Sequence, residues 1–117
     1  MTYKEMRQLS GMTQQKFADF FGIPKRTIED WDAGKSTCKP YLVELLAYRI
    51  MNQNNDFERC YFNVKELRLA TGMTQSEFAK YFGVLLGTLK HWEGVKPCAD
   101  YVLTLIEYKL FCEKIII

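Results

Sequence analysis

The feature that most constrains the fold of this chain is a sequence that occurs twice. The tetrapeptide Gly-Met-Thr-Gln occupies positions 11–14 and returns at positions 72–75, 61 residues later, in a chain of 117 residues. Identical residues continue at that spacing on both sides and, after one deletion, at a spacing of 60. They include Lys4 and Lys65, Arg7 and Arg68, Phe17 and Phe78, Phe21 and Phe82, Gly22 and Gly83, Thr27 and Thr88, Trp31 and Trp92, Cys38 and Cys98, and Tyr48 and Tyr108. A repeat at a fixed spacing indicates a duplicated structural unit.

The length of the repeat predicts the domain organisation. Each copy spans about 50 residues, and a unit of that size buries little surface and is marginally stable alone. We therefore expect residues 1–55 and 63–117 to form two repeats that pack together as one compact unit, with residues 56–62 as a linker. One interpretation of the linker is a short helix that carries its aromatic residues into the space between the copies. These residues are Phe57, Tyr61 and Phe62.

Helix signals recur in each copy and predict an all-α fold. Thr2 and Glu5 have the spacing of a capping box, and Asn63 and Glu66 repeat that pattern. The expected helices cover about residues 3–10, 14–21, 24–32 and 41–51 in copy one, and about 64–71, 75–82 and 100–113 in copy two, from capping, glycine and apolar-spacing signals. The apolar end of the chain, at 115–117, either folds back on the core or joins a dimer interface.

Composition fits a globular protein and excludes several classes. Hydrophobic residues make up 48% and charged residues 26%, which is typical of a soluble globular chain. No stretch approaches the apolar length of a membrane span, and the start of the chain lacks a signal-peptide core. The four cysteines contain no Cys-x-x-Cys pair, so we expect free thiols in a reducing compartment. The matched Cys38 and Cys98 are interpreted as small, semi-buried residues.

The sequence offers no pattern for catalysis or metal binding. It contains no glycine-rich phosphate loop, no His-Glu-x-x-His, no Gly-x-Ser-x-Gly and no zinc-like cysteine spacing. The single histidine, His91, has no partner at metal-ligand spacing. Acidic pairs such as Asp30 and Asp32 are expected at helix ends without a basic or histidine partner, which acid–base chemistry needs. We therefore expect no enzymatic activity, no cofactor and no metal ion.

The order of the repeated residues resembles a known family. Copy one contains Gly-Met-Thr-Gln, then Phe-Ala, Phe-Gly and Thr-Ile-x-x-Trp-x-x-Gly, and copy two matches nearly as fully. This order resembles the lambda repressor-like helix-turn-helix proteins of the Cro and XRE type, and the resemblance covers most of the chain. It implies two tandem helical bundles in which a third helix enters the DNA major groove. Members are commonly bacterial or phage regulators of transcription, which implies a cytoplasmic location.

The resemblance also implies roles for residues of copy one. Gln14, at the start of the second helix, would contact the DNA backbone. The first exposed residues of the third helix would read base edges, and these are Lys25, Arg26 and, one turn later, Asp30. The loop after that helix would touch phosphates through Lys35, Ser36 and Lys39.

The chemistry of these side chains agrees with the implied roles. Arg26 can donate two parallel hydrogen bonds to guanine O6 and N7, and Lys25 can donate one to the same edge. Thr27 can bond a phosphate or a base. Asp30 can accept a hydrogen bond from cytosine N4, although an acid near phosphates also repels them.

Copy two departs from the pattern at the positions that would read bases. The residues there are Leu85, Leu86 and Gly87, in place of Pro24, Lys25 and Arg26. Leucine cannot hydrogen-bond a base edge, although it can contact a thymine methyl, and glycine weakens a helix by about 1 kcal/mol relative to alanine. Copy two either contacts DNA, mainly at phosphates, or uses its leucines for an apolar contact with copy one, a second chain or another protein. The residues for phosphate contact are Gln75, Lys90, His91 and Lys96.

These observations lead to one main hypothesis and one rival. The formal charge is only +2, from 16 basic and 14 acidic residues, so the placement of charge matters more than its sum. We interpret the chain as a sequence-specific protein that binds double-stranded DNA and regulates transcription, most simply as a repressor. The rival is a protein-binding inhibitor or adaptor built on the same duplicated scaffold. In that case repeat 2 would be the interaction surface, for a homodimer or another protein partner.

Overall fold

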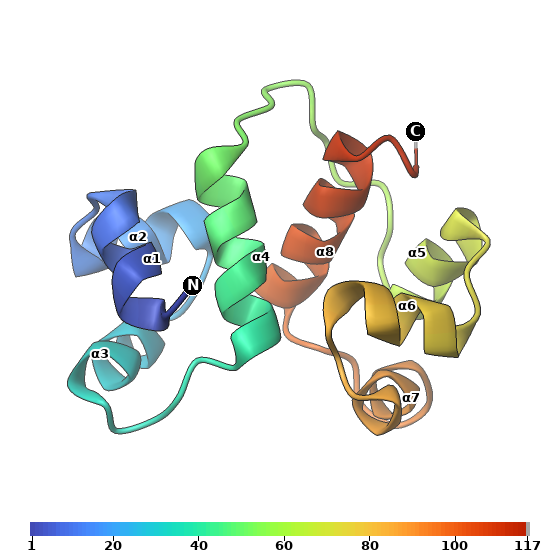
Figure 1. The fold of residues 1–117 in the computed structure, drawn as a ribbon, viewed down its shortest axis with the longest axis horizontal. Helices are drawn as coiled ribbons and strands as arrows, with labels where there is room; N and C mark the ends of the chain where they lie inside the picture. The colour runs from blue at the N-terminus through green and yellow to red at the C-terminus, as the bar shows by residue number, and fades with distance from the viewer. Residues whose placement is uncertain (117) are drawn as a thin grey trace. The chain divides into compact units, whose positions relative to one another are not determined.

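A computed structural model describes residues 1–116 of the chain (Figure 1). Within this range it contains eight α-helices and no strand, so the predicted all-α fold class is confirmed. None of these helices has the length and apolar character that crossing a membrane requires. The internal contacts divide the chain into two compact units, unit 1 at Met1–Met51 and unit 2 at Asn52–Ile117. The packing of the two units on each other stays a prediction.

Each unit contains four helices, and the four helices of one unit correspond in sequence position to the four of the other (Figure 1). Those of unit 1 are α1 (Tyr3–Ser10), α2 (Gln14–Phe21), α3 (Lys25–Ala33) and α4 (Pro40–Met51). Those of unit 2 are α5 (Val64–Thr71), α6 (Gln75–Phe82), α7 (Leu86–Gly94) and α8 (Asp100–Cys112). The seven helices whose bounds were predicted agree with the prediction to within one residue, because capping side chains and glycines mark most helix ends.

The same four positions form the centre of each unit, one from each helix. In unit 1 the fully buried residues at these positions are Met6, Phe17, Ile28 and Leu46. In unit 2, at the repeat spacing, they are Leu67, Phe78, Leu89 and Ile106. A buried side chain of this size contributes about 1.5–3 kcal/mol to folding. A core of this kind is small, so polar contacts that hold the helices together matter more than in a larger domain.

The segment 52–62 contains no helix, so the prediction of a short linker helix is wrong. It instead lies along α8, where the buried carboxylate of Glu107 accepts hydrogen bonds from the backbone N–H groups of Cys60 (2.7 Å) and Tyr61 (3.4 Å). Phe57 packs edge-on against Tyr108, with ring centroids 5.1 Å apart. These side chains satisfy the backbone of an extended segment, which removes the need for helical hydrogen bonds.

This arrangement also assigns the segment to unit 2. The hydroxyl of Tyr108 donates to the carbonyl of Asn52 and accepts from the backbone N–H of Asn54 at 2.8 Å. Phe62, expected to lie between the copies, is 88% exposed. Unit 1 has an alanine, Ala47, at the position of Glu107. Comparison of the two repeats therefore could not predict the role of Glu107.

Ile115 and Ile116, the described part of the apolar end, fold back on α8, which is one of the two alternatives that the sequence left open. The backbone N–H groups of Ile115 and Ile116 donate to the carbonyl of Leu110, at 2.9 and 3.5 Å. Ile116 is buried and Ile115 is half-buried. Ile117 lies outside the described residues.

The four cysteines are free thiols, and their exposure differs. Cys38 is buried and Cys98 is half-buried, as the sequence indicated, whereas Cys60 is exposed. Burial raises the pKa of the Cys38 thiol to about 12 and that of Cys98 to about 11. Both thiols therefore stay protonated near neutral pH and act as small apolar residues.

Gly83→Ala is expected to lower the free energy of unfolding of unit 2 by about 1–2 kcal/mol. Gly83 has a φ of 68° in the turn between α6 and α7, a conformation in which a Cβ is strained. Urea unfolding, followed by the fluorescence of Trp92 in a Trp31→Phe background, reports on unit 2.

Gly87→Ala is the matched control. Neither site has an atom within 4 Å of an added Cβ, so space is not the variable, but Gly87 is helical and has no positive φ. Alanine there should be neutral or should stabilise the unit by up to about 1 kcal/mol. Equal effects at the two sites would contradict a backbone origin for the loss at Gly83.

Candidate nucleic-acid interface

A short turn fixes the start of α3 relative to α2. Gly22 ends α2 with a φ of 68°, and the backbone N–H of Ile23 donates to the carbonyl of Ala18 at 3.0 Å. The side chain of Ile23 is buried and anchors the turn in the core of unit 1. Pro24 then precedes the first residue of α3, so a buried anchor lies only two residues before Lys25.

The first turn of α3 is exposed and cationic. Lys25 and Arg26 are both exposed, and the side chain of Arg26 is 78% exposed. Pro24 provides no side-chain cap, and the first turn contains no acid. The N-terminus of a helix has a partial positive charge and unsatisfied N–H groups, so two further cations there disfavour folding and favour an anionic ligand. Thr27, in the same turn, is half-buried.

The other helix starts show that this absence of a cap is not general. Four helices begin with a side chain that accepts a hydrogen bond from the third residue of the helix. They are α1 with Thr2, α2 with Thr13, α5 with Asn63 and α6 with Thr74. The third helix of each unit lacks this bond, since α3 follows Pro24 and α7 follows Leu85. So does α8, which follows Ala99.

Two of the three predicted base-reading residues form an ion pair. The Nε of Arg26 donates to the Oδ1 of Asp30 at 3.2 Å, one helical turn away. Asp30 therefore has a basic partner, and the prediction that the acids at this helix lack one is wrong. The third residue, Lys25, is exposed at the helix start.

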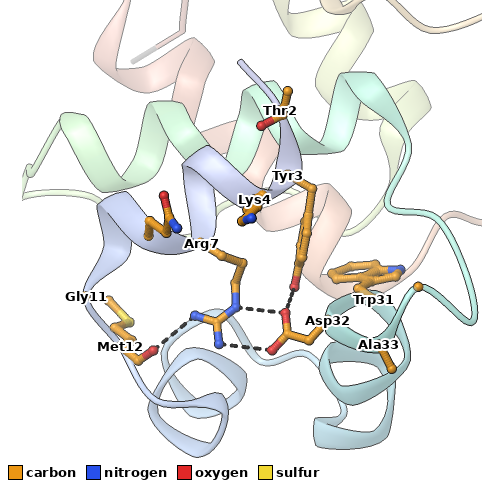
Figure 2. Close-up of a pocket in the computed structure, with 11 residues that line it drawn as sticks. Thr2, Tyr3, Lys4, Arg7, Gly11, Met12, Trp31, Asp32 and Ala33 are labelled. Atoms are coloured by element: carbon orange, nitrogen blue, oxygen red, sulfur yellow. Dashed lines mark hydrogen bonds and ion pairs between the residues drawn. The ribbon is translucent and has the colours of Figure 1, made fainter.

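Asp32 also has a basic partner, in a network that joins α1 to α3 (Figure 2). The guanidinium of Arg7 donates through Nε and Nη2 to the two carboxylate oxygens of Asp32, at 3.1 and 3.2 Å. Its Nη1 donates to the carbonyl of Met12 at 3.0 Å, in the connection that leads to α2. The hydroxyl of Tyr3 donates to Asp32 at 2.6 Å.

Gln14, predicted to contact the DNA backbone, belongs to the same network. It is half-buried, and its Nε2 donates to the Oδ2 of Asp32 at 3.0 Å. This bond uses part of the amide that a phosphate contact would need. The phosphate role of Gln14 stays a prediction.

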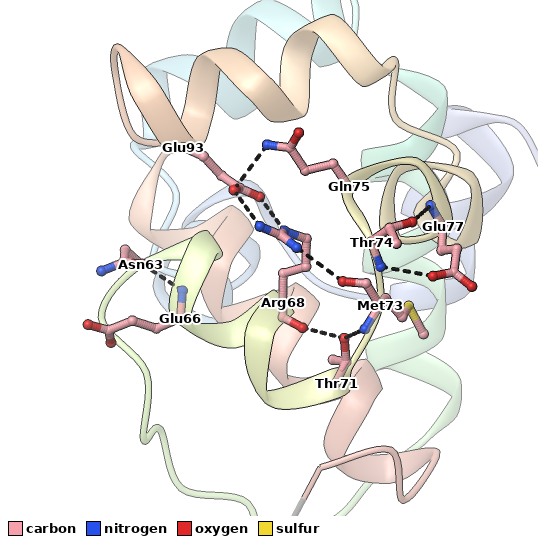
Figure 3. A network of polar contacts seen from close by, with 9 residues as sticks. All are labelled: Asn63, Glu66, Arg68, Thr71, Met73, Thr74, Gln75, Glu77 and Glu93. Carbon is pink, nitrogen blue, oxygen red and sulfur yellow. Dashed lines mark hydrogen bonds and ion pairs between the residues drawn. The ribbon is translucent and has the colours of Figure 1, made fainter.

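Unit 2 contains a corresponding network at the repeat spacing (Figure 3), without the tyrosine, because Val64 stands where unit 1 has Tyr3. Arg68 donates through Nε and Nη2 to the carboxylate of Glu93, at 2.8 and 3.0 Å, and through Nη1 to the carbonyl of Met73 at 3.1 Å. Gln75 donates to Glu93 at 3.2 Å. The Arg68 and Glu93 side chains are only 11% and 5% exposed. We call each of these networks the Arg–acid clamp of its unit: Arg7 with Asp32 in unit 1, and Arg68 with Glu93 in unit 2.

The clamp changes the pKa of its acids. The hydrogen bonds from Arg68 lower the pKa of Glu93, against a smaller opposing effect of burial, with a further contribution from Gln75. Burial acts most strongly on Asp32 and raises its pKa, but the combined hydrogen bonds from Arg7, Tyr3 and Gln14 outweigh it, so that its pKa is also lowered. Both acids are therefore held as carboxylates at neutral pH.

Sequence reasoning missed this clamp, although a signal was present. Arginine recurs at the repeat spacing at positions 7 and 68, and an acid recurs at 32 and 93. Preservation of opposite charges in two otherwise diverged copies is what an internal ion pair produces.

The remaining predicted residues of unit 1 lie in the loop between α3 and α4. Lys35, Ser36 and Lys39 are all exposed. The backbone N–H groups of Lys35 and Ser36 donate to the carbonyl of Asp30, at 2.9 and 3.4 Å, which closes the end of α3. Their side chains are available at the surface.

In unit 2 the corresponding surface has a different chemistry. Leu85 is 78% exposed and Leu86 is 36% exposed, so the predicted leucine pair does lie at the surface. Lys90, His91 and Lys96, predicted to contact phosphates, are exposed as well, and Gln75 is half-buried in the clamp.

An open hollow of about 870 Å³ lies beside the clamp of unit 1 (Figure 2). Its walls include Tyr3 and Trp31, whose rings meet edge-on with centroids 5.8 Å apart. Two of its polar lining residues, Arg7 and Asp32, are bonded to each other. In residues 1–116 no group of three or more histidines, cysteines or acids is placed to hold a metal ion.

Comparison with known proteins gives no match. No protein-family model, no curated protein and no solved structure matches the chain. The resemblance to the lambda repressor-like proteins therefore stays a prediction, and the function is inferred from the residues and their geometry.

Glu93→Gln is expected to lower the free energy of unfolding of unit 2 by about 1.5–3 kcal/mol at pH 7, because it replaces hydrogen bonds from Arg68 to a charged group. As pH falls, Glu93 of the unfolded chain takes up a proton near its ordinary pKa of about 4.3. Glu93 of the folded protein, with its lowered pKa, takes up the proton only at a lower pH. The contribution of Glu93 is thus fully present above the ordinary pKa and is lost as pH falls through the lowered pKa. Urea unfolding at pH 7 and pH 3, followed by the fluorescence of Trp92 in a Trp31→Phe background, should show that the difference in unfolding free energy between this background and its Glu93→Gln variant narrows at the lower pH.

Glu66→Gln provides the control for a carboxylate in the same unit. Glu66 is exposed on α5 and makes no side-chain contact with Arg68. Its substitution should change stability by no more than about 0.5 kcal/mol. A difference between wild type and Glu93→Gln that does not depend on pH would argue against the clamp as its source.

Proposed function

We propose that both units are helix-turn-helix units of the lambda repressor-like type and that unit 1 binds double-stranded DNA with α3 in the major groove. The protein would be a sequence-specific regulator of transcription, acting as a repressor when it occupies an operator. One observation carries the proposal: Lys25 and Arg26 are exposed at an uncapped helix start that a buried turn holds in place. An anion at this end would satisfy the helix N–H groups and both cations.

Residue roles follow from this placement. Arg26 and Lys25 would donate to base edges, for which guanine O6 and N7 are the best acceptors. Thr27 and the loop residues Lys35, Ser36 and Lys39 would bond phosphates and set the register of α3 on the duplex. Gln14 would add a backbone contact through the part of its amide that Asp32 does not use.

Unit 2 would contribute to DNA binding in a different way. Its third helix begins with Leu86 and Gly87 after Leu85, so its start cannot donate to base edges as α3 does. Lys90, His91 and Lys96 follow later and could add phosphate contacts. Base reading is therefore proposed for unit 1 alone.

Arg26→Ala should weaken binding to a selected site by about 1–3 kcal/mol and relax preference at one base pair. Lys35→Ala should weaken all sequences alike and reduce the slope of log affinity against log salt by about one. The site is first selected from random duplex DNA. Affinities for single-base variants are then measured by fluorescence anisotropy at two salt concentrations.

Lys80→Ala removes one cation from the exposed surface of α6 and serves as the matched control. It should change neither the sequence preference nor, by more than about 0.5 kcal/mol, the stability. If Arg26→Ala keeps the affinity and base preference of the wild type, α3 does not read the site as proposed.

A second candidate function rests on the exposed leucines of unit 2. Leu85 and Leu86 are adjacent, and an exposed apolar pair is more often an interface than an isolated feature. Unit 2 would then bind a second copy of the chain or another protein, and the protein would act as an adaptor or inhibitor. This function is compatible with DNA binding by unit 1.

The double substitution Leu85→Ser and Leu86→Ser tests the self-association form of this function. If two chains meet through these leucines, loss of their burial should raise the dimer dissociation constant by tenfold or more, since each buried leucine contributes about 1.5–3 kcal/mol. Sedimentation equilibrium measures the constant, and anisotropy with the selected duplex reports DNA binding in parallel. Leu69→Ser, at a 60% exposed leucine of α5, is the control and should leave association unchanged. A monomeric wild type, or equal association of all three proteins, removes the leucines from any homodimer.

A further inference from the structure

We propose that Asp30 is a positioning residue, which holds the Arg26 guanidinium so that its two terminal nitrogens face one guanine. The inference rests on the proposed function, because it assigns the base that α3 recognises. It replaces direct base contact by Asp30, which the sequence had suggested, with an action through Arg26.

The geometry of the ion pair is what favours this role. Asp30 accepts from Nε of Arg26 at 3.2 Å, and neither Nη1 nor Nη2 has a hydrogen-bond partner among residues 1–116. A guanidinium is planar and presents its donors in a fixed fork. Fixing Nε therefore leaves the end formed by Nη1 and Nη2, which can donate two parallel bonds to guanine O6 and N7.

Stability alone does not account for the pair. Arg26 is 78% exposed, and exposed ion pairs one turn apart contribute little to a helix. The order of charges, with the cation nearer the helix N-terminus, is also the less favourable one for the helix dipole. What the pair does provide is order, because an arginine held in one conformation loses less conformational freedom when it binds.

Unit 2 supplies a comparison within the same chain. At the positions of Arg26 and Asp30 it has Gly87 and His91. The unit that lacks the reading arginine thus also lacks the acid that would orient it, whereas the acid of the clamp is kept as Glu93. The two acids of α3 therefore follow different constraints.

The test is a double-substitution cycle on the selected duplex and its single-base variants. Arg26→Ala should lower the discrimination for guanine at one base pair by about 5- to 100-fold. Asp30→Asn should lower discrimination at that same base pair by about two- to fivefold, as expected for the loss of a surface ion pair. In the Arg26→Ala background Asp30→Asn should have no further effect there, and Asp30→Glu, which keeps the carboxylate, should retain most of the discrimination.

Glu29→Gln is the matched control, since it removes an exposed acid from the neighbouring position of α3. Loss of either negative charge should raise the affinity for all duplexes, but only Asp30→Asn should lower discrimination at the base pair of Arg26. Circular dichroism of each variant checks that it keeps the helical content of the wild type.

The possible outcomes separate this inference from the proposed function. A wild-type protein that binds no duplex overturns both. If Arg26→Ala lowers the discrimination for guanine and Asp30→Asn does not, the positioning role alone is overturned. A change of preference at a different base pair in Asp30→Asn would mean that Asp30 contacts a base directly, and this result also overturns the role.

Discussion

The structure of each unit depends on the clamp between an arginine of the first helix and an acid of the third. Arg7 and Arg68 each bond a carboxylate, Asp32 or Glu93, and also the backbone carbonyl that precedes the second helix. One guanidinium thus joins the first helix of the unit to the third and to the connection that leads to the second. Units of about 50 residues have small cores, and a network that fixes several elements at once compensates for limited apolar burial. The ion pair of unit 2 differs from a surface salt bridge, because the side chains of Arg68 and Glu93 are largely shielded from water.

A scaffold held in this way leaves its surface free to change. Four core positions and the clamp correspond between the units, whereas the residues at the start of the third helix do not. In unit 1 that start carries Lys25 and Arg26, and in unit 2 it carries leucine and glycine. The acid at the end of the third helix is retained in both units because Arg7 or Arg68 needs it. Substitutions at an exposed helix start cost little folding energy, so a duplicated unit can acquire a second kind of surface without losing its fold.

Much of the fold could be predicted from the sequence because its signals are local. Thr2 and Thr74 mark helix starts, and Gly22 and Gly83 mark helix ends through conformations that glycine adopts readily. The path of residues 52–62 could not be predicted, since it depends on Glu107 and Tyr108, which are about 50 residues distant in the chain and satisfy its backbone. The clamp was missed for a related reason. A charged residue on a short helix suggests a solvated side chain, and only the recurrence of opposite charges at the repeat spacing indicates an internal pair.

The low net charge of the chain is compatible with a local anion-binding surface once the partners of each charge are known. Between Lys25 and Lys39, four cations face three acids in the sequence. Asp32 is neutralised by Arg7 from another helix, and Asp30 is bonded to the Nε of Arg26, which leaves the terminal nitrogens of that arginine without a partner among residues 1–116. The potential that a duplex would meet is therefore more positive than the count of charges indicates, since electrostatic attraction to phosphates depends on local fields and not on the total.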